Sequence, residues 1–408
     1  MIKKHRSNYF ILFSTLFGAF LSAYLSTSVN AALPIIAREF NVSDSYTSWI
    51  LTSSLLVTSM TVLPVGKIAD SYGRKKILLL GTLIVTITSI FGGLAGSVTA
   101  IIIYRSIQGI GIAMLGATVL SIVSSSFPAN KRGKAIGINI AATYIGLSAS
   151  PFISGIILNY INWRAIFFLS VPLSLIILAL FSIMDNEWKD ETTHPIDFKG
   201  SVIYAIGILA VIWGLVNFNQ LLWARWTVLL GLLVLLLFGY YETKTPYPLL
   251  DIKTIRHNRV LIFSSLASFI NYSSTYAISY MMNIFLQTIY GVPPQYVGVV
   301  LLVQPAMQAL FSPLAGSLSD KMAPRYVASA GMSLISVNLF FLSTLTPDTA
   351  LFKIVLILAM IGLGFALFSS PNSNSIMSSM NKNEYGVAAA ILTTSRTVGQ
   401  SFSMALTA

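Results

Sequence analysis

The feature of this sequence that most constrains its fold is a series of long apolar stretches. Each stretch has about 20 or more mostly apolar residues, which is enough for a helix to cross a lipid bilayer. The runs are continuously apolar, so the alternating strands of a transmembrane β-barrel are excluded. We predict thirteen membrane-spanning helices, at residues 9–36, 46–65, 77–97, 98–127, 136–160, 163–184, 200–220, 224–241, 260–288, 295–318, 326–346, 350–369 and 386–408.

The composition supports a chain embedded in a lipid bilayer. Only 9% of its residues are charged and 55% are hydrophobic, whereas soluble domains carry about 25% charged residues. In lipid every backbone polar group needs a partner within its own segment, which favours helices. The sequence therefore predicts an all-α polytopic membrane protein, with its first apolar stretch retained as a span rather than removed as a signal peptide.

The net charge of +12 is explained by where the basic residues lie, and not by binding to nucleic acid. If the N-terminus is cytoplasmic, 19 of the 25 Lys and Arg residues fall in cytoplasmic segments, four fall outside and two fall within spans. Cytoplasmic loops of membrane proteins carry this excess of positive charge. We therefore expect a multi-pass protein of the plasma membrane with a cytoplasmic N-terminus.

The order of spans and loops predicts two bundles separated by an insertion. A charged loop follows the sixth span, and "GKIADSYGRKK" from Gly66 is echoed 250 residues later by "GSLSDKMAPRYV" from Gly316. Eight spans separate the two loops, so two six-helix halves need two extra helices between them. We expect an N-terminal bundle at 1–185, a cytoplasmic loop at 186–199, inserted helices at 200–243 and a C-terminal bundle at 244–408. The last bundle is expected to be incomplete, since the final apolar run has no polar end.

Several motifs together resemble the major facilitator superfamily, and in particular its fourteen-span drug:proton antiporter branch. Besides "GKIADSYGRKK", they are "STSVNAALP" from Ser26, "YRSIQGIG" from Tyr104, "GLSASPFISG" from Gly146, "WRAIFFLSVP" from Trp163 and "ILTTSRTVGQS" from Ile391. The resemblance covers nearly the whole chain. It implies a secondary active transporter with a major-facilitator fold, which exports small amphipathic compounds by alternating access.

The loop at 66–76 contains candidate gating residues. Gly66 and Gly73 allow close backbone approach and a sharp turn, while Asp70 can pair with Arg74 or cap a neighbouring helix. Contacts of this kind would latch one state of a transport cycle; the alternative is a cluster of charges that only fixes topology. We include Asp320, in the echoed loop, among the gating candidates.

Pro151 is a further gating candidate, since it is expected to bend the fifth span. Here the sequence departs from the antiporter signature, which has Gly where this chain has Ser150 and Ser154. Serine is small enough to keep close helix packing.

A carboxylate that the resemblance leads us to expect is missing. The fourteen-span branch has an acidic residue five positions before the residue that matches Asn30, and this chain has Leu25 there. All 13 Asp and Glu residues and all three His residues lie in loops or at span ends. Neutral or anionic substrates are therefore favoured over dications. Proton coupling through Glu39, Asp44 or Asp70, and uncoupled transport, both remain open.

Two arginines lie within predicted spans, where charged side chains usually have a function. Arg105 is followed three residues later by Gln108, on the same helical face. We expect Arg105 to face a central cavity and to orient substrate or relay protons there; the resemblance implies proton transfer at this position. The alternative is that it holds helices together by bonding to carbonyl groups or to Thr27 and Asn30. Arg396 lies in the last span and is a second candidate, or else marks the end of that helix.

A polar stripe in the predicted span at 260–288 is a candidate part of the substrate cavity. Tyr272, Tyr276, Tyr280, Asn283 and Gln287 recur at helical spacing, so they would share one helical face. Aromatic and amide groups suit an amphipathic ligand; the alternative is hydrogen-bonded packing between helices.

The sequence disfavours an enzyme. No His lies in a predicted span, and no metal-binding cluster or nucleophile–base pair is visible, so we expect no cofactor. The partners expected are a small-molecule substrate, the lipid bilayer and, if transport is coupled, protons. The alternatives are an uncoupled or narrow-substrate transporter of neutral or anionic solutes, and a polytopic membrane protein that transports nothing.

Overall fold

The computed structural model describes residues 2–189, 195–219, 221–292 and 294–407. Over these ranges the chain is helical, with no strand. Its elements are α1 (Ile2–Thr27), η1 (Ser28–Ala32), α2 (Leu33–Glu39), α3 (Asp44–Tyr72), α4 (Arg74–Gly93), α5 (Val98–Ser126), α6 (Ala129–Tyr160), α7 (Arg164–Ser182), α8 (Phe198–Val216), α9 (Ala224–Glu242), α10 (Ile252–His257), α11 (Arg259–Thr275), α12 (Ile278–Thr288), α13 (Pro294–Lys321), α14 (Pro324–Ser343), α15 (Leu351–Ser378), η2 (Lys382–Glu384) and α16 (Tyr385–Thr407).

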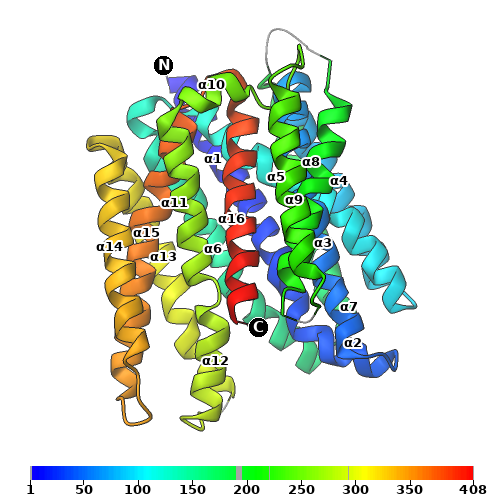
Figure 1. Ribbon diagram of the computed structural model, residues 1–408, viewed down its shortest axis with the longest axis vertical. Coiled ribbons are helices and arrows are strands. Elements are labelled where there is room, and N and C mark those ends of the chain that lie inside the picture. The colour runs from blue at the N-terminus through cyan, green and yellow to red at the C-terminus, as the bar shows by residue number, and fades with distance from the viewer. Residues whose placement is uncertain (1, 190–194, 220, 293, 408) are drawn as a thin grey trace.

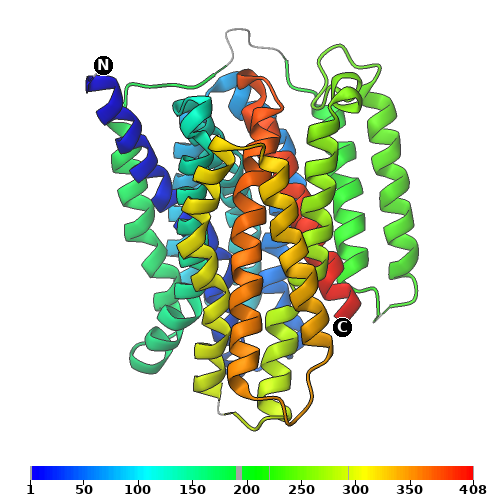
Figure 2. The same cartoon turned by 90° about the vertical axis from the view of Figure 1, so that its left-hand side faces the viewer.

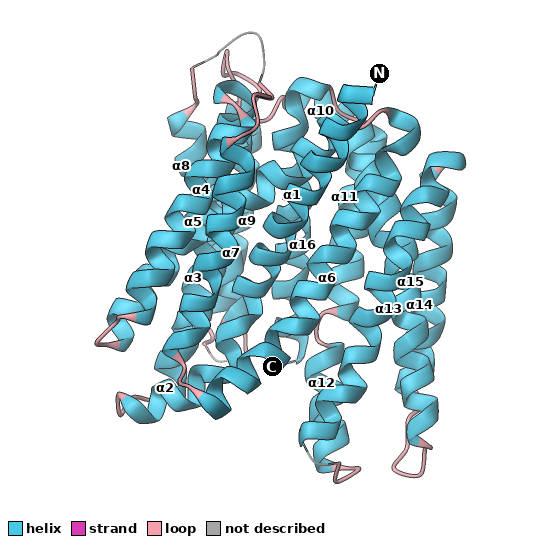
Figure 3. Ribbon diagram, turned by 180° about the vertical axis from the view of Figure 1, so that it is seen from behind, coloured by secondary structure: helices cyan, strands magenta, loops and turns pink. Residues whose placement is uncertain are grey.

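The long helices run side by side and their connections gather at two opposite faces (Figure 1, Figure 3). We call the face on which α1 begins the N-terminal face; α10 lies there too, and α16 ends toward the opposite face. Successive long helices alternate in direction, so the basic connections after α3, α5, α9, α13 and α15 all fall on the N-terminal face. The bias in Lys and Arg therefore corresponds to one physical surface.

Eleven helical segments of the described chain are long and apolar enough to cross a membrane. They correspond to eleven of the thirteen predicted spans. The two others differ for separate reasons. Residues 260–288 form two helices, α11 and α12, instead of one. The stretch at 386–408 does form the 23-residue helix α16, but its sequence is interrupted by polar side chains.

The interruption between α11 and α12 has a local cause. The backbone N–H of Ala277 donates to the hydroxyl of Ser403 on α16, at 3.1 Å, rather than to its own helix. A helix continues only while each N–H bonds to the carbonyl four residues earlier. The chain consequently turns at Tyr276 and Ala277 before α12 begins.

Two close helix contacts join the first and last parts of the chain at the N-terminal face. On α3, a Cβ atom at Gly66 would lie 2.6 Å from the carbonyl oxygen of Gly386 on α16. On α13, a Cβ atom at Gly316 would clash with the carbonyl oxygen of Gly133 on α6. Backbones approach this closely only where side chains are absent. The repeated glycines of the two echoed loops thus make equivalent contacts.

Helices α8 and α9 pack on each other and lie at the edge of the bundle, where α8 contacts α3 and α16 (Figure 2). One side of α9 is exposed and strongly apolar, and its exposed side chains are Trp226, Leu229, Leu230, Leu232, Leu233, Leu236, Leu237 and Tyr240. In a membrane such a surface faces the lipid tails. This is the pair of helices that the sequence predicts as an insertion between two bundles.

Candidate functional site

Asp70 links helix α3 to helix α16 at the N-terminal face. Its side chain is buried, with 3% of its surface exposed. One carboxylate oxygen accepts from the N–H of Gly386 at 2.8 Å, and the other accepts from the N–H of Val387 at 3.0 Å. The first N–H groups of a helix have no partner in their own helix and carry partial positive charge. Asp70 on α3 therefore caps the start of α16.

Arg74 completes this contact. Its Nε donates to Asp70 at 2.8 Å, and its Nη2 donates to the backbone carbonyl of Lys382 at 2.5 Å. The guanidinium groups of Arg74 and Arg132 lie 5.6 and 5.5 Å from the ring centre of Tyr385, distances typical of cation–π contacts. Asp70 and Arg74 thus meet both expectations from sequence, the ion pair and the helix cap.

The echoed loop makes the same kind of contact in the other direction. Asp320, at the end of α13, accepts from the N–H of Gly133 at 2.7 Å and from the N–H of Lys134 at 2.9 Å, in the second turn of α6. We call the two contacts, Asp70 with α16 and Asp320 with α6, the paired latch. Gly73 shapes the turn beside it, since its φ of +118° is one that residues with a side chain rarely adopt.

Pro151 lies inside α6, which continues through it as one helix, and its side chain is exposed. The serines around it face α1. Ser150 donates to the carbonyl of Tyr24 at 3.3 Å, and Ser154 donates to the carbonyl of Ser28 at 2.9 Å. Both serines are fully buried. The departures from the antiporter signature therefore replace glycines with small residues that pack closely and also bond to the neighbouring backbone.

Arg105 is buried in the first half of the chain, with 2% of its surface exposed. It donates to the carbonyl of Leu25 at 3.1 Å, to the carbonyl of Ile50 at 3.3 Å and to Oε1 of Gln108 at 2.6 Å. Gln108 in turn donates to Ser89 at 2.8 Å. The network joins α1, α3, α4 and α5, and its acceptors are neutral.

Thr27 and Asn30, the residues of the motif "STSVNAALP" that could bond to Arg105, make other contacts or none in the described structure. The hydroxyl of Thr27 donates to the carbonyl of Ala23 on its own helix, at 3.3 Å. Asn30 is exposed in η1. Among the hydrogen bonds of the described residues, neither side chain bonds to Arg105. Of the two kinds of partner that the sequence offered for a helix-holding Arg105, the structure shows the backbone carbonyls and not Thr27 or Asn30.

Arg396 lies in the middle of α16 and does not mark its end. Its Nη2 donates to the hydroxyls of Ser373 at 2.8 Å and Ser369 at 3.4 Å on α15. Its guanidinium lies 5.6 Å from the ring centre of Tyr272. The Nε of Arg396 is buried and has no hydrogen-bond partner. One donor of this cation is thus free to bind an acceptor brought by a ligand.

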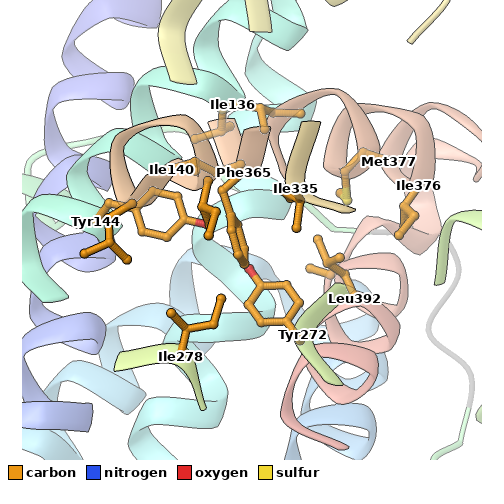
Figure 4. Packing of buried hydrophobic residues seen from close by; sticks show 14 of the residues in the cluster. Ile136, Ile140, Tyr144, Tyr272, Ile278, Ile335, Phe365, Ile376, Met377 and Leu392 are labelled. Atoms are coloured by element: carbon orange, nitrogen blue, oxygen red, sulfur yellow. The ribbon is translucent and has the colours of Figure 1, made fainter. Parts of the chain in front are cut away.

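Two more rings extend this group across the bundle. Tyr272 of α11 and Tyr144 of α6 pack edge-on against Phe365 of α15, at 5.6 and 6.5 Å between ring centres. Figure 4 shows both tyrosine hydroxyls directed toward Phe365. We call Tyr144, Tyr272, Phe365 and Arg396 the central aromatic cluster. It contains side chains from α6 in the first half of the chain and from α11, α15 and α16 in the second.

Most of the predicted polar stripe does not join this cluster. The stripe does not share one helical face, because the chain is interrupted between α11 and α12. Tyr276 and Tyr280 are 47% and 49% exposed, and Asn283 accepts from Gln287 on α12 at 2.7 Å. Within the stripe, Tyr272 alone is part of the central aromatic cluster.

Tyr144, Ser369 and Ser373 were not among the site residues predicted from the sequence. A signal for the serines was present, because "SSPNSNS" (residues 369–375) is a polar run inside an otherwise apolar span. Tyr144 carried no such signal, since a single tyrosine in a span is ordinary. Its position becomes meaningful only when α6 is placed against α15.

Comparison with known proteins gives one consistent picture. A family model described as Major Facilitator Superfamily matches residues 15–404. Among curated proteins, the riboflavin transporter RibZ of Clostridioides difficile is 30% identical over 393 residues, with 96% of this chain and 85% of RibZ covered. The multidrug resistance protein Stp of Mycobacterium tuberculosis is 27% identical, with 98% and 75% covered. The tetracenomycin C resistance and export protein of Streptomyces glaucescens is 27% identical, with 95% and 73% covered.

Solved structures agree on the fold. The proton:xylose symporter XylE superimposes with a TM-score of 0.72 at 16% identity, with 97% of this chain and 87% of that structure covered. The human organic anion transporter MFSD10 gives a TM-score of 0.70 at 13% identity, with 98% and 92% covered.

Proposed function

The chain belongs to the major facilitator superfamily, and we propose that it exports small amphipathic compounds that carry aromatic rings and are neutral or anionic. It is a transporter and not an enzyme. We place it in the plasma membrane, within the fourteen-span antiporter branch, with the N-terminal face toward the cytoplasm, since that face collects the basic loops.

The central aromatic cluster is the observation that carries the proposed substrate class. It provides ring faces for stacking and a cation with one unbonded donor, Nε of Arg396. In the described chain, no carboxylate lies near the middle of a helix, so a cationic substrate would find no negative partner there. An aromatic solute with carbonyl or acidic groups matches both features.

The comparisons support this substrate class in two ways. One relative is named as a riboflavin transporter, and a flat heterocycle without positive charge suits aromatic side chains and a guanidinium donor. The relatives named for multidrug resistance and for tetracenomycin C resistance and export support outward transport. We therefore take riboflavin as the first compound to test and a cationic dye as its contrast.

We propose that the paired latch is the cytoplasmic gate. Asp70 joins α3 of one half to the first turn of α16 in the other half, and Asp320 joins α13 to the second turn of α6. That both contacts are formed here supports assigning this conformation to the state closed toward the cytoplasm. Alternating access then requires that both contacts of the paired latch break together, which admits a substrate to the central aromatic cluster from that side.

Replacing Arg396 by Gln tests the substrate proposal. The amide introduced by Arg396→Gln would keep a hydrogen-bonding group near Ser373 but would remove the charge and the contact with the Tyr272 ring. We expect export of riboflavin or an anionic dye from cells expressing the protein to fall at least about tenfold, the equivalent of one lost interaction of about 1.4 kcal/mol.

Lys353→Gln, which removes an exposed cation on the opposite face, is the matched control and should leave export unchanged. Selective export of ethidium, unaffected by Arg396→Gln, would contradict the proposed preference for neutral and anionic compounds.

Replacing Leu25 by Asp tests how transport is coupled. The carbonyl of Leu25 accepts from Arg105, so a carboxylate at this position would lie near a buried cation. We expect wild-type export to depend weakly on a protonophore and Leu25→Asp to become sensitive to it, because the new carboxylate can bind and release a proton. Wild-type export that a protonophore already abolishes would show that another residue carries the coupling.

A further inference from the structure

Two carboxyl groups meet where the inserted helices reach the N-terminal face. Asp197 directly precedes α8, and Glu242 is the last residue of α9. Glu242 is 2% exposed. Neither residue takes part in the paired latch or in the central aromatic cluster, so neither has a role in the function proposed above.

Each carboxyl group uses one oxygen to hold the backbone. Oδ1 of Asp197 accepts from the N–H of Gly200 at 2.8 Å and from the hydroxyl of Tyr241 at 3.3 Å. Oε2 of Glu242 accepts from the N–H of Leu250 at 2.9 Å. These bonds cap α8 and fix the segment that follows α9.

The remaining two oxygens converge on one point. Oδ2 of Asp197 and Oε1 of Glu242 are both buried and have no hydrogen-bond partner. A Cβ atom at Gly200 would clash with both of them, so the two oxygens meet above this glycine. Two buried acceptors that face each other repel unless a hydrogen atom lies between them.

No basic side chain neutralises this pair among the described residues. The ion pairs of the described chain join Arg74 to Asp70 and Arg164 to Glu39. Lys199 and Lys244 are exposed, and the ammonium group of Lys244 lies over the ring of Tyr240 at 4.4 Å. On α3, which packs against α8, the charged groups at this face are Lys67 and Asp70, and Asp70 is bonded to Arg74.

We propose that Asp197 and Glu242 form a proton-binding site, in which one proton is shared between Oδ2 and Oε1. Two negative charges that lie next to each other cannot both persist in a buried place, so one of the two carboxyl groups is held neutral. The site is formed at the ends of the inserted helices, and proton binding there does not depend on the substrate or on the direction of transport.

The site is connected to the gate through the segment that Glu242 holds. Leu249 is 1% exposed and packs among α3 and α16 residues. The same segment lines a cavity of about 610 Å³ together with Lys67, Asp70 and Lys382. With the proton bound, the segment 243–251 stays docked beside the latch. When the proton is lost at higher pH, two adjacent negative charges repel and the segment is released.

Infrared spectroscopy on the purified full chain tests the site directly. We expect one carboxylic acid carbonyl band that disappears reversibly as pH rises through the range of about 5 to 9. The band should be absent in Glu242→Gln and in Asp197→Asn, which both keep an oxygen for the backbone caps. Asp251→Asn is the matched control: the Thr254 hydroxyl holds the pKa of Asp251 below its usual range, so this exposed group is ionised and contributes no band.

A spin label on a cysteine at exposed position 253, two residues beyond the docked segment, reports whether that segment is held or released, since the chain has no other cysteine. We expect its mobility to rise with pH in the wild-type background and to stay low at every pH in Glu242→Gln. A wild-type band that persists unchanged across this pH range, or a label that responds to pH equally in Glu242→Gln, would overturn the proposal. Neither measurement requires transport, so failure here is distinct from failure of the proposed function.

Discussion

Replacing Asp70 by Asn is expected to shift the protein about a hundredfold toward a state open at the N-terminal face, and to reduce transport strongly. The carboxylate accepts two N–H groups at the start of α16 and pairs with Arg74, all in a buried place. An asparagine can satisfy one of those N–H groups, but its own NH₂ group faces the other. Breaking a buried pair of this kind costs about 3–5 kcal/mol, and about 2.8 kcal/mol corresponds to a factor of 100.

Distance measurements across the gate give the readout. Spin labels on cysteines at Tyr72, which is half exposed, and at Lys382 lie on the two sides of the latch. In the wild-type background we expect a short, narrow distance distribution, and in Asp70→Asn a second, longer population that predominates. Asp348→Asn, which removes an exposed carboxylate near the opposite face, should leave the distribution unchanged.

Asp320, the residue equivalent to Asp70 in the echoed loop, provides a second variant for this test. Asp320 also accepts two N–H groups but no arginine forms an ion pair with it among the described residues. Asp320→Asn should therefore open the gate to a smaller extent than Asp70→Asn. If both variants keep the short distance while transport is lost, the paired latch is not the gate and Asp70 acts in transport itself.

Of the candidate site residues, Asp70 is the one whose contacts the sequence predicted best. Gly66 and Asp70 recur as Gly316 and Asp320 at the same spacing, and each pair lies at a helix end next to basic residues. That pattern depends only on local sequence, because a glycine and an acid one helical turn apart can pack and cap without help from distant side chains. What the pattern did not reveal was the partner, since the start of α6 and the start of α16 are identified only by the fold.

The central aromatic cluster shows where prediction from the sequence stops. Arg396 was visible as a charge within a span, but Tyr144 and Phe365 are ordinary residues for an apolar helix. Their contact depends on how α6 packs against α15. The stripe on residues 272–287 failed for a related reason: its helical spacing was correct, yet one hydroxyl on α16, that of Ser403, diverts a backbone N–H and divides the helix.

Replacing Arg105 by Leu is expected to unfold the first half of the molecule at markedly lower temperature. Arg105 bonds to carbonyls of α1 and α3 and to Gln108 in the buried network. Leu25 lies in the last turn of α1, where carbonyls lack partners within the helix and favour a cation. A hydrogen bond to a charged group contributes about 1.5–3 kcal/mol, so losing several should cost more than most substitutions do. Thermal unfolding of the purified protein in detergent measures the loss.

A double substitution separates a structural role for Arg105 from a role in transport. In Arg105→Leu, the side chain of Gln108 loses its buried partner and is left with an unsatisfied oxygen. Removing both polar groups, in Arg105→Leu combined with Gln108→Leu, should recover much of the stability, because an unpaired buried group costs more than an absent pair. Ser89, which Gln108 contacts, still accepts from Ser170 at 2.7 Å.

Because every acceptor of Arg105 in the described network is neutral and two are backbone carbonyls, we expect transport to recover together with stability in the double variant. In that case Arg105 holds four helices together and does not relay protons. Flux measured on the two variants at equal amounts of folded protein decides the question. A double variant that is stable but transports nothing would contradict this expectation and would assign Arg105 a direct part in moving substrate or protons.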